Sequence, residues 1–120
     1  MKNTNITAVA AIAAIYYPAG VTAETVAKWQ QENKKGIARL DSEFEGKPYA
    51  AYIRRPTRDD MRELSAKAGS TDPVTYAEII LDQLWLGGDE EIRTVDEVFY
   101  GVEHVVQNVL SVQVATLKKL

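Results

Sequence analysis

The amino-acid sequence predicts an α+β domain that is mainly helical, with about four to five helices and one antiparallel β-hairpin. Apolar residues recur at helical spacing in residues 73–85 and again from residue 95 onward, which indicates helices that bury one face. Within residues 37–54, two short strand-like segments flank a turn centred on Gly46, which is typical of a β-hairpin. Local start and stop signals along the chain support each element.

Length and composition indicate one globular domain. A chain of 120 residues is long enough to bury about two thirds of its unfolded surface. The net charge of −3 gives no overall attraction to nucleic acid or to an anionic membrane. The absence of cysteine excludes disulfides, thiolate metal sites and cysteine nucleophiles. No apolar run reaches the roughly 18 residues that a membrane span needs.

An apolar segment, residues 1–20, precedes the single α+β domain of residues 21–120. Residues 6–17 are almost wholly apolar and rich in alanine, which favours a helical extension packed on the domain or on another subunit. A signal peptide is the alternative, because one lysine precedes an apolar stretch of suitable length. If this helix does not pack within the monomer, it is a predicted surface for self-association.

The first helix of the domain is predicted over residues 22–35. Thr22 suits its N-cap and Gly36 suits its end. Trp29 lies on its narrow apolar face, and such a residue is expected at the rim of the core or at a binding surface. The helix is therefore amphipathic and peripheral.

The hairpin is predicted to pair residues 37–44 with residues 49–54. In the second strand, Tyr49, Ala51 and Ile53 point to one face and Tyr52 to the other, because side chains alternate along a strand. One face should pack on helices, since a two-stranded hairpin is marginal alone. The open edge of the hairpin is a second predicted surface for self-association.

Two helices are predicted directly after the hairpin. Thr57 can cap the first, which is expected to end at Gly69, and Asp72 followed by Pro73 begins the second. This second helix carries two adjacent apolar rows that make a wide core face. The pair Gly87-Gly88 is expected to close it in the left-handed conformation.

The last helix is predicted to begin at Thr94. Glu97 follows at the capping-box spacing of three residues. Valines and other apolar residues then recur at helical spacing, so one long helix is expected towards residue 120.

One block of the sequence is similar to a known family. The block consists of Trp85, Leu86, Gly87, Gly88, Asp89 and Glu90, followed by Glu91-Ile92 and then Asp96-Glu97. It resembles the W-L-G-G-D-E/P-E-I-x-T-x-D-E pattern of the tail assembly chaperone family encoded by tailed phages and prophages. The upstream order is similar too, with a short helix that carries a tryptophan and a hairpin that ends in Tyr52-Ile53-Arg54-Arg55-Pro56. The resemblance covers roughly residues 22–118, and residues 1–20 extend beyond it.

This resemblance implies a non-enzymatic protein of the host bacterial cytoplasm. Its partner would be the long, helical tape measure protein, held soluble while tail subunits polymerise around it, and the W-L-G-G-D-E block would be a structural signature. No catalytic residue, metal or cofactor is expected, and neither is a membrane or nucleic-acid partner. An amphipathic client helix would lie in a groove between helices. The predicted client contacts are Trp29, Tyr49, Tyr52 and Tyr100.

The polar residues near the block are predicted to be solvated rather than catalytic. The carboxylates there do not have the spacing of an EF-hand loop, so an acidic turn is predicted instead of a calcium or magnesium site. His104 is the single histidine, and no nucleophile lies at a recognisable spacing from it. A surface or core-rim position is therefore predicted for His104.

The alternative function is a DNA-binding regulator. The basic residues concentrate in one stretch beside the hairpin, as in winged DNA-binding modules. They are Arg54, Arg55, Arg58, Arg62 and Lys67. Acidic residues interrupt this stretch, whereas electrostatic binding to phosphates favours a continuous basic surface.

Overall fold

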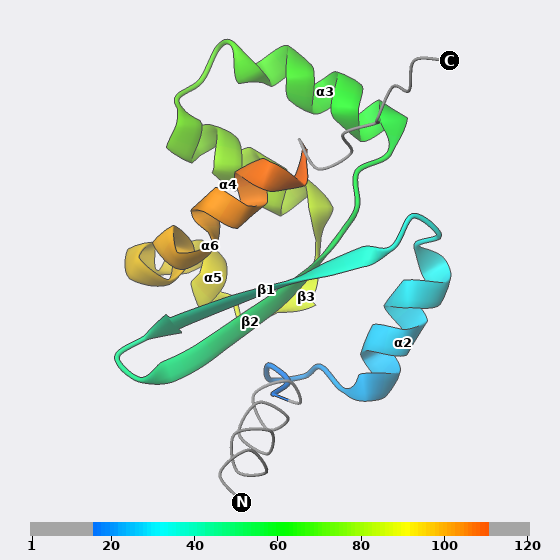
Figure 1. The fold of residues 1–120 in the computed structure, drawn as a ribbon, viewed down its shortest axis with the longest axis vertical. Helices are drawn as coiled ribbons and strands as arrows, with labels where there is room; N and C mark the ends of the chain where they lie inside the picture. Colours follow the sequence, from blue (N-terminus) through cyan, green and yellow to red (C-terminus); the bar gives the residue numbers. More distant parts are fainter. Residues whose placement is uncertain (1–15, 111–120) are drawn as a thin grey trace, which may run out of the picture.

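The computed structural model describes residues 16–110, which form five helices and a three-stranded antiparallel sheet (Figure 1). This arrangement confirms the predicted fold class, a mainly helical α+β domain. No helix within these residues has both the length and the apolar character needed to cross a bilayer. In chain order the elements are α2 (Ala23–Glu32), β1 (Ile37–Phe44), β2 (Lys47–Arg54), α3 (Arg58–Ala68), α4 (Pro73–Leu84), β3 (Trp85–Gly88), α5 (Glu91–Thr94) and α6 (Asp96–Val109).

The central strand of the sheet is β2, which pairs with β1 on one side and with β3 on the other. β1 and β2 form the predicted hairpin, whose last pair places Phe44 opposite Lys47. Its turn takes only Glu45 and Gly46, both at positive φ, a geometry that matches the twist of paired strands. The second strand therefore begins two residues earlier than expected.

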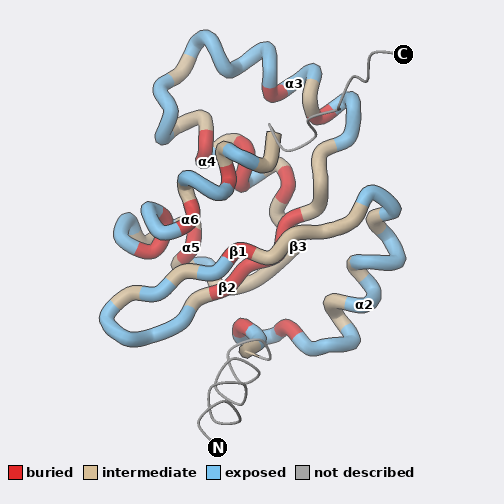
Figure 2. Tube along the Cα trace, in the orientation of Figure 1, coloured by how far each residue is buried: buried red, intermediate tan, exposed pale blue. Residues whose placement is uncertain are grey.

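Helices cover one face of the sheet, and α2 lies on the other side (Figure 1). Buried residues concentrate in β2, α4 and α6, whereas α2 contains none (Figure 2). The predicted alternation along β2 is confirmed, because Ala51 and Ile53 belong to the core. The core cluster consists of Leu40, Ala51, Ile53, Leu64, Ala77, Ile80, Leu81, Leu84, Ile92, Val98, Phe99, Val102 and Val106.

Side-chain hydrogen bonds confirm the predicted starts of α2, α3 and α4. In each helix the cap side chain accepts a bond from the backbone N–H three residues later, at 3.2 Å for Thr22, 3.2 Å for Thr57 and 2.8 Å for Asp72. These bonds satisfy first-turn amides that have no partner within a helix. Gly69 ends α3, also as predicted.

The expected role of Gly87 and Gly88 as the end of a helix is wrong. α4 ends at Leu84, and the next four residues form β3, which pairs antiparallel with β2. Trp85 and Leu86 continue the apolar pattern of α4, so periodicity alone extends the helix. The edge of β2 instead supplies backbone partners, and a strand there satisfies groups on both segments.

Thr94 does not cap the last helix, so the predicted capping box is also wrong. Its hydroxyl donates to the Glu90 carbonyl at 3.1 Å, within the short helix α5. α6 begins at Asp96, with Val95 in the N-cap position and no side-chain cap bond. Threonine hydroxyls often bond to nearby backbone, and here that local bond replaces the cap.

The predicted helices at residues 22–35, at the N-terminus and at the C-terminus have different outcomes. α2 stops at Glu32, before the expected residue 35, because Asn33 closes it with bonds to the Trp29 carbonyl from its backbone N–H at 3.0 Å and its side-chain amide at 2.8 Å. The proposed N-terminal helix (residues 6–17) falls almost wholly outside the described residues. The continuation of the last helix beyond residue 110 lies outside them as well.

Candidate functional site

The W-L-G-G-D-E block forms β3 and the turn after it, at the edge of the sheet opposite β1. Gly88 has a φ of +144°, and a Cβ there would lie 2.4 Å from the Ala51 Cα and 2.6 Å from the Ala50 carbonyl oxygen. Side-chain carbons do not approach backbone atoms so closely. Glycine is therefore the residue that lets β3 pair tightly with β2.

Gly87 makes room for an aromatic ring from α2. A Cβ at Gly87 would lie 2.8 Å from Cη2 of Trp29. The same indole ring lies 5.5 Å from the ring of Tyr52, with the two planes tilted by 46°, an arrangement that aromatic pairs favour. Trp29 is half-buried, as expected for a core-rim residue, and it anchors α2 on the sheet.

Asp89 fastens the end of β3 to β2. Its backbone N–H donates to the Ala50 carbonyl at 2.8 Å, and its carboxylate accepts from the Ala50 N–H at 3.0 Å. The Tyr16 hydroxyl donates to the same carboxylate oxygen at 2.9 Å. Burial, together with this bond to a carboxylate, raises the pKa of Tyr16 to about 12, because a phenolate there would face a negative charge.

The other residues of the block lie nearer the surface. Leu86 is half-buried and Glu90 is exposed. Arg93 donates to Glu90 at 2.8 Å, and its guanidinium carbon lies 3.9 Å from the centroid of the Trp85 ring. Together with the contacts of Gly87, Gly88 and Asp89, these interactions give the block a structural role in joining β3 to β2 and α2.

The four aromatic residues predicted to contact a client do not form one surface. Tyr52 is only 4% exposed, and Arg39 donates to its hydroxyl at 2.8 Å, so this central-strand residue is inaccessible to a partner. Trp29 covers it on the side of α2. Tyr49 packs against the core cluster on the helical face, whereas Tyr100 on α6 is 59% exposed. Tyr100 is therefore the most accessible of the four.

Ion pairs divide the basic stretch predicted as an alternative DNA-binding surface. Arg54 donates from both terminal nitrogens to the Asp60 carboxylate, and Arg62 pairs with Asp59 one turn away. Arg54 and Arg62 are thereby neutralised, whereas Arg55 and Arg58 have no carboxylate partner among the described residues. The stretch is not a continuous cationic surface.

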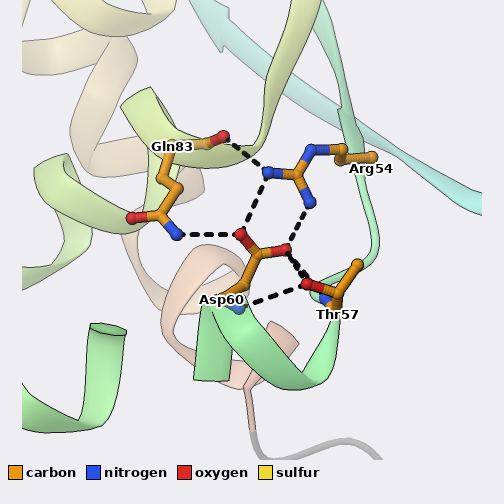
Figure 3. Close-up of polar contacts among 4 residues, drawn as sticks. All are labelled: Arg54, Thr57, Asp60 and Gln83. Carbon is orange, nitrogen blue, oxygen red and sulfur yellow. Dashed lines mark hydrogen bonds and ion pairs between the residues drawn. The ribbon is translucent and has the colours of Figure 1, made fainter. Parts of the chain in front are cut away.

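Asp60 is the one buried charged residue in the described part of the chain. Besides Arg54, its carboxylate accepts from the Gln83 side-chain amide at 2.8 Å and from the Thr57 N–H at 2.7 Å (Figure 3). The Arg54 guanidinium holds the pKa of Asp60 well below its usual range, because a cation and several donors favour the charged carboxylate.

This network joins β2, α3 and α4, and only part of it was predictable from the sequence. Asp60 was expected to contribute a favourable charge in the first turn of α3. Its spacing of three residues from Thr57 was the available signal, because that is the spacing of a capping box. The contacts with Arg54 and Gln83 depend on the fold and had no local signal.

A pocket of about 410 Å³ lies beside this network, where α3 begins. It brings together the segment after α2, the residues that follow β2, the first turn of α3 and the end of α6. The sequence placed Arg55 and Arg58 in a basic stretch but did not connect them with Lys35 or with α6. The lining residues are Lys35, Arg55, Pro56, Thr57, Arg58, Met61, Val109 and Leu110.

The histidine and the acidic residues occupy ordinary surroundings. His104 is exposed on α6, with its Nε2 3.3 Å from the side-chain nitrogen of Asn108. Within residues 16–110, no three His, Cys, Asp or Glu side chains lie close enough together to hold a metal ion.

Comparisons of this chain with models of protein families, with curated proteins and with solved structures found no match. The residues, their geometry and the sequence pattern of the block are therefore the basis for assigning a function.

Proposed function

We propose that this protein is a non-enzymatic assembly chaperone that binds a helical client, as tail assembly chaperones of tailed phages bind the tape measure protein. The observation that carries this proposal is the W-L-G-G-D-E block at residues 85–90, which resembles the pattern of that family. Such a protein works in the cytoplasm of the host bacterium and needs neither a metal nor a cofactor.

The geometry of the block supports a shared fold as the reason for the resemblance. Gly88 permits close pairing of β3 with β2, Gly87 admits the ring of Trp29, and Asp89 bonds to Ala50. The backbone contact at Gly88 requires glycine, whereas the contacts of Gly87 and Asp89 favour those residue types. A protein with the same block would build the same sheet edge and dock a tryptophan-bearing helix on it.

We place the client helix on the outer face of α6, which carries two of the four exposed large apolar side chains of the described residues. Tyr100 and Val105 are 59% and 47% exposed, and His104 lies between them on the same exposed face. A helix packs on another by inserting its side chains between those of the neighbour, and amphipathic clients bind through such apolar contacts. An exposed tyrosine is a frequent anchor of interfaces.

The test is co-expression of the full chain with a tape measure protein encoded near it, followed by size-exclusion chromatography with light scattering. The wild type is expected to form a soluble complex with a client that is insoluble alone. Tyr100→Glu is expected to lose this complex. Val74→Glu is the matched control, because Val74 is an exposed apolar residue of α4, at 40% exposure.

A client that stays insoluble in the presence of the wild type would refute the chaperone function. A soluble complex that tolerates Tyr100→Glu would place the client on another surface. Complexes lost equally in both variants would indicate a general effect of added charge rather than a specific contact at Tyr100.

A DNA-binding regulator is the second candidate, favoured by the cluster of Lys35, Arg55 and Arg58 at one pocket. Binding of duplex DNA whose affinity falls steeply with salt would favour this function, because phosphate contacts release counterions. Tight client binding that persists in high salt would favour the chaperone.

A further inference from the structure

The pocket at the start of α3 combines cationic and apolar side chains. We infer that it binds an organic anion, a carboxylate or phosphate group carried on an apolar body. Its volume of about 410 Å³ lies within the range of roughly 300–1,000 Å³ found for small-ligand sites. The pocket is separate from the α6 face proposed for a client, and its ligand does not depend on that function.

The arginines that line this pocket differ from the other arginines of the described chain in having no ion-pair partner there. Arg55 and Arg58 line it without an ion pair to any residue between 16 and 110, and the same is true of Lys35. The protein is acidic overall, with a net charge of −3, so carboxylates are plentiful elsewhere. Cations left unpaired together favour an anion from outside. The other arginines of the described chain all pair with carboxylates: Arg39, Arg54, Arg62 and Arg93.

The nearest buried carboxylate does not neutralise this cluster. The Asp60 carboxylate accepts hydrogen bonds from Arg54, Thr57 and Gln83 (Figure 3). These bonds also fix the first turn of α3, which carries Arg58. The network therefore orders the backbone that carries Arg58, whose exposed side chain has no ion pair with any residue between 16 and 110.

A backbone contact brings together the two segments that carry Lys35 and Arg55. The Arg55 N–H donates to the Gly36 carbonyl at 3.1 Å, which joins the segment bearing Lys35 to the end of β2. The Arg55 side chain passes 3.8 Å from the place that a Cβ of Gly36 would occupy. The fold already orders the backbone at these positions, so ligand binding has only the side chains of the donors to immobilise.

The apolar lining argues for an anion with a hydrocarbon body rather than a bare inorganic ion. Met61 of α3, together with Val109 and Leu110 at the end of α6, lines the pocket, and all three residues are half-buried. An inorganic anion would leave this surface in water. A hydrocarbon body covers it, which is favourable in proportion to the apolar area removed from water.

The test is a titration of the full chain followed by amide NMR. The probes are hexyl phosphate, hexanoate, inorganic phosphate and hexan-1-ol. Hexyl phosphate or hexanoate is expected to give saturable shifts at the amides of Arg55, Arg58 and Leu110, with inorganic phosphate and hexan-1-ol at least about tenfold weaker. The stronger of the two organic anions identifies which charged group the site prefers.

Matched variants separate this site from general electrostatic attraction. Arg58→Gln is expected to weaken binding of the organic anion by about tenfold, and Lys35→Gln provides an independent removal of charge. Arg62→Gln should keep the wild-type affinity, because Arg62 already pairs with Asp59 on the exposed face of α3. Shifts that do not saturate at millimolar probe, that map elsewhere, or that weaken equally in Arg58→Gln and Arg62→Gln would overturn the inference.

Discussion

The absence of a Cβ at the single residue Gly88 permits β3 to pair closely with β2. In Gly88→Ala the new Cβ would lie 2.4 Å from the Ala51 Cα, at a φ of +144° that L residues rarely adopt. We expect this variant to lower the free energy of unfolding by about 3 kcal/mol, measured by equilibrium urea denaturation.

A second glycine supplies the control for Gly88→Ala. Gly69 ends α3 at an ordinary φ of −83°, with nothing within 4 Å of the position of a Cβ. Gly69→Ala is therefore expected to change the free energy of unfolding by no more than about 0.5 kcal/mol. Similar losses in the two variants would contradict the assignment of the cost to the contact with β2.

The ion pair between Asp60 and Arg54 is expected to stabilise the folded protein. The side chain of Asp60 is 8% exposed, and that of its partner Arg54 is 27% exposed. Asp60→Asn removes the charge while keeping the shape, and leaves the guanidinium partly buried without its partner. We expect Asp60→Asn to lower the free energy of unfolding by about 2 kcal/mol at neutral pH. This is less than the cost of breaking a fully buried ion pair, because Arg54 still reaches water.

The dependence of this loss on pH follows from the direction of the pKa shift. The Arg54 guanidinium depresses the pKa of Asp60 in the folded protein, so the folded state favours the carboxylate. The stabilisation is complete above the ordinary aspartate pKa of about 4 and is lost as the pH falls through the depressed value. Urea denaturation from neutral to acidic pH should show that the difference in free energy of unfolding between wild type and Asp60→Asn becomes smaller. A difference that stays constant with pH would contradict the assignment. Asp59→Asn, at an exposed residue, is the control and should change the free energy of unfolding little at any pH.

At the scale of elements, Trp29 and Gly87 couple α2 to the sheet. Gly87→Ala would place a Cβ 2.8 Å from the indole ring, and a ring at the end of a side chain can move aside. We expect Gly87→Ala to cost about 1 kcal/mol in the wild type but less than about 0.3 kcal/mol in a Trp29→Ala background. Urea denaturation of both single variants and the double variant measures this coupling. Additive losses would show that the ring does not rest on Gly87.

Elements with local signals were predictable, and those that depend on distant partners were not. The starts of α2, α3 and α4 rest on cap residues that bond only three positions along the chain, such as Asp72 with Thr75. β3 was missed because Trp85 and Leu86 extend the apolar pattern of α4. The strand exists because β2 offers a free edge, and that edge is formed by residues far away in the sequence.

Across the whole molecule, the accessibility of the predicted site residues also depends on parts of the chain that are far away in the sequence. Tyr52 and Tyr100 were both predicted as client contacts because both are aromatic. In the structure Tyr52 is buried on the central strand beneath α2, whereas Tyr100 lies on an exposed helix face. The pocket at the start of α3 draws on three separate stretches of the chain, at residue 35, residues 55–61 and residues 109–110. Its arginines are visible in the sequence, but only the fold shows which of them lack an ion pair within residues 16–110.

The layering of the molecule predicts an order of local stability. β2 is paired on both edges and contains the fully buried Ala51 and Ile53, whereas α2 has no buried residue and is held through Trp29. Amide hydrogen exchange is expected to be slowest in β2 and fastest in α2, because opening α2 exposes little apolar surface. Trp29→Ala should accelerate exchange throughout α2 while leaving Ala51 and Ile53 protected. Equal protection of α2 and β2, or simultaneous loss in both upon Trp29→Ala, would mean that α2 unfolds only together with the core.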